Sequence, residues 1–312
     1  MTGPVHGRLS DDRLHWQHGP IDLIIKAWGE RDEVEAAYEQ AWQRFQVLLA
    51  ELVAELPLLR TPLGEAYPLL QGSVARRMAA AVWPHRGVYI TPMAAVAGAV
   101  ADEILAALCA HRNLRKAYVN DGGDIALHLA PGERLAIGVV NDPQRPALAA
   151  TATIDHASPA RGVATSGWHG RSHSLGIADA VTVLAASAAE ADAAATLVAN
   201  AVDTDYPSIR RMPARALRAD TDLGEIPVTV AVGPLPQESV EAALDAGVRA
   251  AGGLHARGLL LAAYLALQGR VRTVLPDCAR IAAGRHAGPE ESRARHRALN
   301  PARNCSKRRS LS

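Results

Sequence analysis

The sequence predicts an α+β protein in which antiparallel strands pack against helices. Three observations support this prediction: a long amphipathic helix follows an early strand, a glycine turn separates two strands within residues 116–129, and helices and strands do not alternate strictly as in a doubly wound fold. Hydrophobic residues make up 49% of the 312 residues, which is enough for a sizeable core.

The first half of the chain is predicted to contain a strand at 21–28, a helix at 31–56, a loop at 57–72, a helix at 91–110, and strands at 116–120, 125–129 and 135–140. The first helix has apolar residues at helical spacing until Pro57 ends the run. The second helix begins with a hydroxyl and a proline at Thr91-Pro92, which is typical of a capped start. The last three strands are separated by glycine turns and are expected to form an antiparallel meander.

The second half is predicted to contain strands at 149–154, 180–185, 228–232 and 271–275, and helices at 190–202, 238–251 and 258–268. The run at 258–268 is apolar throughout and ends at Gly269. It is too short to span a bilayer, so we expect a buried helix there.

Composition predicts the extent of the folded part. Residues 1–284 are expected to form a single domain, in which residues 1–20 are polar and partly an extended strand. Residues 285–312 are basic and polar and are predicted to form a disordered tail. An arm that binds nucleic acid or an acidic partner is the alternative for this tail.

Composition and charge argue against several classes of function. A net charge of +1 supplies no field for steering onto nucleic acid or an anionic membrane, and aromatic residues at 4% leave little for base stacking. Three widely spaced cysteines favour neither a disulfide framework nor a zinc site. The start of the chain has no apolar run, and Asp102 and Glu103 interrupt the apolar residues 91–110. We therefore expect a cytoplasmic protein without a membrane helix.

The first candidate site is the run Asn120-Asp121-Gly122-Gly123-Asp124. Adjacent glycines between two strands are typical of a hairpin turn, which is the structural interpretation. Glycines also let backbone N–H groups approach a phosphate closely. Since the neighbouring carboxylates would repel a pyrophosphate, the functional interpretation requires a cation or a ribose hydroxyl beside this turn.

The second candidate is Asp192 with Thr196, four residues later in a predicted helix. This spacing places a carboxylate and a hydroxyl on one helix face, one turn apart. Both are hard oxygen ligands of the kind that Mg²⁺ takes alongside water and phosphate oxygens. The alternative is an aspartate that interacts with the helix N-terminus and a threonine in the core.

The third candidate is the segment 164–176, which is rich in glycine and hydroxyl groups. Its notable residues are Thr165, Ser166, Gly167, His169, Arg171 and His173. Together they could form a phosphate-binding or acid–base wall, and an ordinary surface loop is the alternative. The segment contains no HExxH or GxSxG pattern, and the chain contains no GxGxxG or GxxxxGK[ST] pattern, so Rossmann and P-loop nucleotide binding lose support.

Taken in order, these segments resemble the ApbE-like superfamily, whose named members are FAD:protein FMN transferases. The resemblance covers roughly residues 88–202, with a weaker match at 258–269. Its elements are the Thr91-Pro92 helix start, the GGDI turn within 120–125, the ATSG segment at 164–167, the strand at 181–184 and the ADxxAT helix at 191–196. The fold of this superfamily is α+β and T-fold-like, with antiparallel sheets carrying helices, which agrees with the meander predicted above.

The resemblance implies roles for particular residues. The implied cofactor-binding residues are Asn120, Gly122, Gly123, Asp124, Thr165, Ser166, Gly167 and Arg171, and the implied magnesium ligands are Asp192 and Thr196. The expected cofactors are therefore Mg²⁺ and FAD or a related dinucleotide.

One departure from the family concerns the catalytic base. In the transferases a His-Ile-x-Asp-Pro segment follows the ATSG segment after a longer insertion and carries that base. Here Gly176 leads almost directly into Asp179 and the strand at 181, so the segment is missing. The chain is thus more similar to a short branch of the superfamily than to the transferases. His173 is our candidate for the proton-transfer group, since imidazole titrates near neutral pH, and His169 is the rival.

We therefore expect a Mg²⁺-dependent protein that acts on the pyrophosphate of FAD, with a protein hydroxyl (FMN transfer) or water (FAD hydrolysis) as acceptor. The alternatives are a flavin-binding or carrier protein without chemistry, and an enzyme of another cofactor pathway on the same scaffold. The expected partners are a small-molecule nucleotide and, for FMN transfer, an acceptor protein, with neither membrane nor nucleic acid. A second copy of the chain, forming a homodimer, is a further possible partner.

Overall fold

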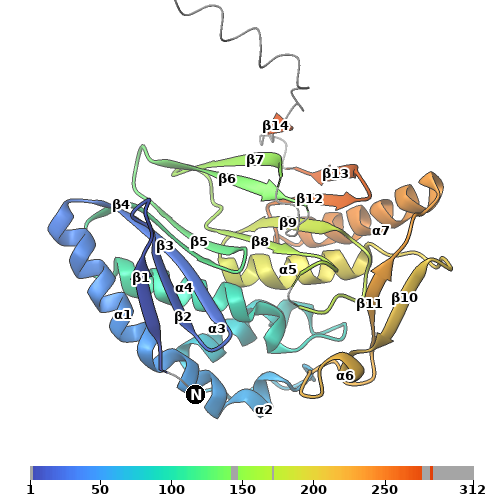
Figure 1. The fold of residues 1–312 in the computed structure, drawn as a ribbon, viewed down its shortest axis with the longest axis horizontal. Coiled ribbons are helices and arrows are strands. Elements are labelled where there is room, and N and C mark those ends of the chain that lie inside the picture. Colours follow the sequence, from blue (N-terminus) through green and yellow to red (C-terminus); the bar gives the residue numbers. More distant parts are fainter. Residues whose placement is uncertain (1–2, 142–146, 171, 276–281, 284–312) are drawn as a thin grey trace, which may run out of the picture.

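The structure is a computed structural model that describes residues 3–141, 147–170, 172–275 and 282–283. Its main sheet contains β1 (Val5–Arg8), β2 (Leu14–His18), β3 (Ile21–Gly29), β4 (Leu114–Asp121), β5 (Asp124–Leu129), β8 (Gly162–Ser166), β9 (Ala180–Ala185), β12 (Ala262–Leu267) and β13 (Arg270–Val274). In the described residues these nine strands follow the order β1-β2-β3-β4-β5-β8-β9-β12-β13, and each neighbouring pair is antiparallel. The sheet runs across the whole molecule (Figure 1).

Two smaller sheets accompany it. One contains β6 (Arg134–Val140), β7 (Leu148–Asp155) and β14 (Ala282–Ala283), and the other is the pair β10 (Ile209–Pro213) and β11 (Pro227–Val232). The β6–β7 pair lies over one face of the main sheet (Figure 1). There Ile137 and Ile154 form one apolar cluster with Leu127 and Leu129 of β5.

The helices are α1 (Arg31–Ala54), α2 (Leu56–Leu59), α3 (Ser73–Val82), α4 (Val96–Cys109), α5 (Ala188–Ala201), α6 (Ala214–Leu217) and α7 (Gln237–Ala256), with 3₁₀ helices η1 (Trp83–His85) and η2 (Pro92–Ala95). The long helices α1, α4, α5 and α7 lie on the face of the main sheet opposite β6 and β7 (Figure 1). This combination of antiparallel sheets and helices confirms the α+β prediction.

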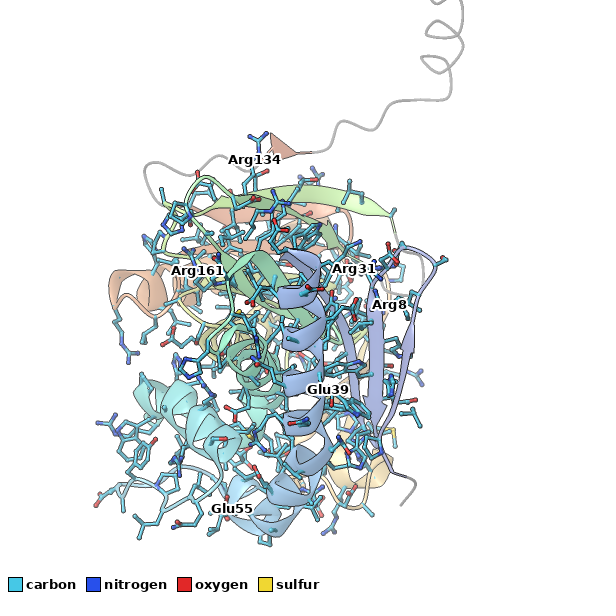
Figure 2. The ribbon with its side chains drawn as sticks, turned by 90° about the vertical axis from the view of Figure 1, so that its left-hand side faces the viewer. Arg8, Arg31, Glu39, Glu55, Arg134 and Arg161 are labelled. Carbon is cyan, nitrogen blue, oxygen red and sulfur yellow. The ribbon has the colours of Figure 1, made fainter. Side chains whose placement is uncertain are left out.

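The first helix is formed as its periodicity predicts. Its buried side chains, among them Phe45 and Leu48, join the core cluster that also contains Leu23 of β3. Figure 2 shows α1 along one side of the molecule, with Arg31 and Glu55 labelled toward its opposite ends.

Alternation along the strands decides which side chains meet the helices. In β9, Val181 and Val183 pack in the same cluster as Val198 of α5. Leu184 packs on the other face, in the cluster of the β6–β7 sheet. The same rule places the polar side chains of the candidate site, because successive residues of a strand point to opposite faces.

The helix that the sequence predicts at 258–268 is wrong, because Ala262–Leu267 form strand β12. This strand lies between β9 and β13 and is buried along its whole length. A strand covered on both faces is apolar without alternation, so periodicity cannot distinguish it from a short buried helix.

The predicted meander is correct only in part. β4 and β5 pair as expected, but β6 does not continue their sheet. The free edge of β5 pairs with β8 through Ile125 and Val163, while β6 pairs with β7. β8 is itself a correction, since residues 162–166 had been assigned to no strand.

Helix α3 was not predicted, although its buried residues Val74, Met78 and Val82 recur at helical spacing. The helix predicted at 91–110 begins with the 3₁₀ turn η2 before α4. Thr91 does not cap it with its side chain; its hydroxyl donates to Oδ2 of Asp222 instead.

The segment Pro92–Cys109 is long and apolar enough to cross a membrane by length and composition alone, and 50% of it is buried inside the protein. Its two acidic residues are both bound within the fold. Asp102 accepts the N–H groups of Ala188 and Ala189, and Glu103 pairs with Arg44 at 2.9 Å. These contacts are those of a helix packed in a protein core.

The predicted tail, residues 285–312, lies outside the described residues. That residues 1–284 form a single domain stays a prediction.

Candidate functional site

The glycine turn closes the β4–β5 hairpin. Asp121 and Asp124 are partners across the ladder, and Gly122 and Gly123 form the two-residue turn with φ of 63° and 117°. These left-handed values favour glycine. Oδ1 of Asn120 accepts the N–H of Gly123 at 2.8 Å and holds the turn. The structural interpretation of this motif is therefore correct, and it leaves the functional one open.

The two carboxylates beside the turn point toward the helices. Asp121 lies on the same face of β4 as Ala117 and Val119. Asp124 lies on the same face of β5 as Ala126. The three apolar residues belong to the core cluster that also contains residues of α4. Asp121 is 6% exposed and Asp124 is 9% exposed. The turn thus places two buried carboxylates between the sheet edge and the helix layer.

Asp192 approaches from the helix side. It lies on α5, and its Oδ2 accepts the N–H of Gly98, in the first turn of α4, at 3.1 Å. Gly98 permits this approach because a Cβ there would lie 2.2 Å from the carbonyl oxygen of Ala188. The N-terminus of a helix is electropositive, so α4 stabilises the charge of Asp192.

The three carboxylates act on one another. The pKa of Asp192 is raised to about 7, because burial and the charge of Asp121 raise it by more than the hydrogen bond from the Gly98 N–H lowers it. Burial also raises the pKa of Asp124 well above its usual range, and the charges of Asp192 and Asp121 add to this effect. Like charges that oppose each other in a buried place are stabilised by a cation among them.

Thr196 lies one helical turn beyond Asp192 on α5 and, like it, is partly buried. Across the residues that the structure describes, no three His, Cys, Asp or Glu side chains gather closely enough to hold a metal by themselves. The described residues therefore do not form a site closed by protein ligands, as zinc would need. Mg²⁺ does fit, because it binds through one or two carboxylates and takes its other oxygens from water and phosphate.

The ATSG segment reaches the same place through its backbone. The N–H of Thr165 donates to Oδ1 of Asp124 at 3.2 Å. The Thr165 hydroxyl turns to the other face of the sheet and lies 2.8 Å from the Thr182 hydroxyl. Ser166 lies on the same face as Ala164, which packs with α5, so its hydroxyl points to the helix side.

Beyond β8 the chain turns back tightly. A Cβ on Gly167 would lie 2.4 Å from the carbonyl oxygen of Asp179, so this glycine is required by close approach. The backbone N–H of Trp168 then donates to the carbonyl of Ala178 at 3.0 Å. Arg171 lies outside the described residues.

The two histidines of this loop differ in their surroundings. Nε2 of His169 lies 3.5 Å from Oδ1 of Asp179, and its ring packs against that of Trp168 at an angle of 35°, with centroids 3.8 Å apart. His173 is partly buried, and no hydrogen bond or ion pair joins its ring to the described part of the chain.

Sequence reasoning did not assign Gly98 and Asp179 to the site. It included Asp121 in the glycine motif but gave this carboxylate no role of its own. Asp121 could have been found, since it stands in the glycine motif. Gly98 carries only a weak local signal, a glycine in an alanine-rich helix. Asp179 carries none, because its partners are set by the tertiary structure.

A family model and several relatives match this chain. The family model described as AbpE bacteria matches residues 6–273. A UPF0280 protein of Methanosphaerula palustris is 36% identical over 192 residues, which are 61% of this chain and 77% of that protein. A UPF0280 protein of Methanopyrus kandleri is 34% identical over 134 residues, 43% of this chain and 51% of that protein. The chain thus spans only about half the length of the Methanopyrus relative.

Two solved structures are similar over most of the chain. The ApbE protein of Thermotoga maritima is 13% identical, with a TM-score of 0.44, and the match covers 86% of this chain and 96% of that one. The flavinyl transferase ApbE of Pseudomonas stutzeri, in its apo form, is 14% identical, with a TM-score of 0.40, and the match covers 87% of this chain and 93% of that one.

Proposed function

Because the chain belongs to the family described as AbpE bacteria, we propose that it binds FAD or a related dinucleotide together with Mg²⁺ and acts on the pyrophosphate. The family membership agrees with the ApbE-like resemblance of the sequence. One flavinyl transferase stands among the similar structures, and its name is a reason to test a flavin first.

The observations that carry the proposal are that Asp124, directly after the glycine turn, accepts the N–H of Thr165, that Asp192 of α5 accepts the N–H of Gly98, and that the charge of Asp192 acts on Asp124. Burial raises the pKa of both carboxyl groups, and Asp124 feels the charge of Asp192. A pyrophosphate could not lie there against ionised carboxylates unless a cation lay between them. Asp192 and Thr196 supply oxygen atoms for Mg²⁺, and the ligand would supply the rest.

The other residues would hold the nucleotide. Gly122 and Gly123 leave the turn without side chains, so a phosphate can approach its backbone. Asn120 stabilises the turn, and Ser166 presents a hydroxyl on the helix side. Asp124, Thr165, Gly167 and Arg171 complete the proposed cofactor-binding set. Bound Mg²⁺ would neutralise charge that builds on the leaving phosphate.

The acceptor can be a protein hydroxyl, which gives FMN transfer, or water, which gives FAD hydrolysis. His173 is the proton-transfer group that the sequence favours for either reaction. We place this activity in the cytoplasm, and a homodimer stays a prediction that light scattering would test.

A carrier without chemistry is the second candidate. One feature favours it: the His-Ile-x-Asp-Pro segment of the transferases is missing between the ATSG segment and Asp179. In that case FAD would bind with Mg²⁺ and remain intact.

One incubation tests both candidates. Purified protein is mixed with FAD and Mg²⁺, and AMP and FMN are followed by chromatography, with chelator as control. Mg²⁺-dependent release of AMP supports the enzyme. Tight FAD binding without AMP supports the carrier, and failure to bind FAD overturns both.

A further inference from the structure

We propose that His169, oriented by Asp179, accepts the proton of the attacking hydroxyl, with Asp179 as its positioning residue. This inference rests on the proposed function and deepens it, because it assigns the acid–base step to two residues of this chain. It also replaces the preference for His173 that the sequence suggests.

His169 and Asp179 lie at the end of the main sheet that also carries the glycine turn. β8 ends at Ser166, which pairs with Val181 of β9, and residues 167–179 connect these two strands. Asp124 of the turn accepts the N–H of Thr165 at 3.2 Å, directly before this connection begins. The glycine turn and the loop 167–179 therefore lie at the same end of the strands.

Asp179 is held from two sides. Its Oδ2 accepts the N–H of Gln268, in the turn between β12 and β13, at 2.6 Å. Its Oδ1 accepts the indole N–H of Trp168 at 3.4 Å and lies 3.5 Å from Nε2 of His169. Since the ring of Trp168 also packs against the imidazole, at an interplanar angle of 35°, both the carboxylate and the imidazole have a defined orientation.

This arrangement decides which ring nitrogen can accept a proton. An ionised carboxylate only accepts hydrogen bonds, so in the proposed arrangement Nε2 of His169, 3.5 Å from Oδ1 of Asp179, carries the hydrogen and Nδ1 keeps its lone pair. Burial raises the pKa of Asp179, and His169 lowers it. When the ring takes a proton, the new positive charge stabilises the partly buried carboxylate, as in other carboxylate–imidazole pairs.

The step balances with the proposed reaction. The oxygen of the acceptor hydroxyl forms a bond to the phosphorus of the FMN half of FAD. The bond from this phosphorus to the bridging oxygen breaks, and AMP leaves with the electron pair. The hydroxyl proton goes to Nδ1 of His169 and then to solvent. The products are AMP and an FMN ester, or AMP and FMN when water attacks.

The test compares release of AMP from FAD and Mg²⁺ by wild type, His169→Gln, Asp179→Asn, His173→Ala and His111→Asn. His111 is the matched control, since it is an exposed histidine after α4, at the far end of β4 from the glycine turn. We expect kcat of His169→Gln to fall about 10²–10⁴-fold, the usual contribution of general acid–base catalysis, with KM for FAD unchanged. The kcat of Asp179→Asn should fall by a smaller factor, again with KM for FAD unchanged.

A second measurement needs no turnover. In ¹⁵N NMR of the imidazole, wild-type His169 should carry its hydrogen on Nε2. Asp179→Asn should lose this preference, because an amide donates as well as accepts. A preserved preference would overturn the role of Asp179.

The outcomes separate this inference from the proposed function. Unchanged turnover in His169→Gln, or a loss confined to His173→Ala, overturns the inference and leaves the proposed function standing. Wild-type protein that releases no AMP with Mg²⁺ overturns the proposed enzyme, and the inference with it.

Discussion

Asp192 accepts the backbone N–H of Gly98 at 3.1 Å, so a carboxylate on α5 caps the first turn of α4. The relationship is reciprocal, because Asp102 of α4 accepts the N–H groups of Ala188 and Ala189 in the first turn of α5. Each helix thus satisfies donors that the other leaves free. The proposed metal ligand is therefore also part of the packing between two core helices.

Gly98→Ala should destabilise the protein. The new Cβ would lie 2.2 Å from the carbonyl oxygen of Ala188, and backbone must move to admit it. Overpacking of this kind costs about 1–3 kcal/mol, which urea denaturation would measure. Gly252→Ala is the matched control, since Gly252 lies in α7 with nothing within 4 Å of its Cβ position. Equal stability of the two variants would show that α4 and α5 separate without cost.

Asp192→Asn should weaken the Mg²⁺-dependent binding of FAD and keep the fold, because the amide can still accept from Gly98 but carries no charge. Calorimetry with and without Mg²⁺ measures the difference. Glu190→Gln is the control, as Glu190 is an exposed acid on the same helix. If FAD affinity depended on Mg²⁺ equally in Asp192→Asn and wild type, the assignment of Asp192 as a metal ligand would be wrong.

Gly123→Val should abolish FAD binding or folding. Space is open around this position, but its φ of 117° strains a β-branched residue by about 1–3 kcal/mol. Gly132→Val separates the two causes, because Gly132 has a φ of 82° and equally open space in the turn after β5. We expect both variants to lose stability in thermal melting and only Gly123→Val to lose FAD affinity. A folded Gly123→Val with normal affinity would mean that the turn is only a connector.

Below neutral pH the stability of the protein should depend on His85. The pKa of His85 is lowered to about 4, chiefly by burial and also by the charge of Arg257. The unfolded chain therefore binds a proton on this residue at higher pH than the folded protein does. Stability is complete above pH about 6.5 and falls by up to roughly 3 kcal/mol as pH decreases toward 4.

His85→Gln should remove this part of the pH dependence. Unfolding free energies at pH 7 and pH 4.5, compared with wild type, measure it. Parallel pH curves for the two proteins would contradict the assignment to His85.

Several elements follow from the sequence because their causes are local. The amphipathic period of α1, the alternation of β3 and the double glycine of the β4–β5 turn are properties of short segments. The ordered motifs from Thr91 to Thr196 also identify the family, which the match over residues 6–273 confirms. Asp192 and Thr196 could be paired in the same way, since one helical turn joins them.

Other elements depend on partners far along the chain. Residues 262–267 become a strand because β9 and β13 flank them and other layers cover both faces, and no local period encodes that burial. The pKa of Asp192 depends on its burial, on Gly98, which lies 94 residues away, and on Asp121. His169 is distinguished from His173 by Trp168 and by Asp179, whose own position depends on Gln268. Local residue type therefore determines which chemistry this chain can offer, while the electric field, the burial and the orientation of each group are properties of the packed structure alone.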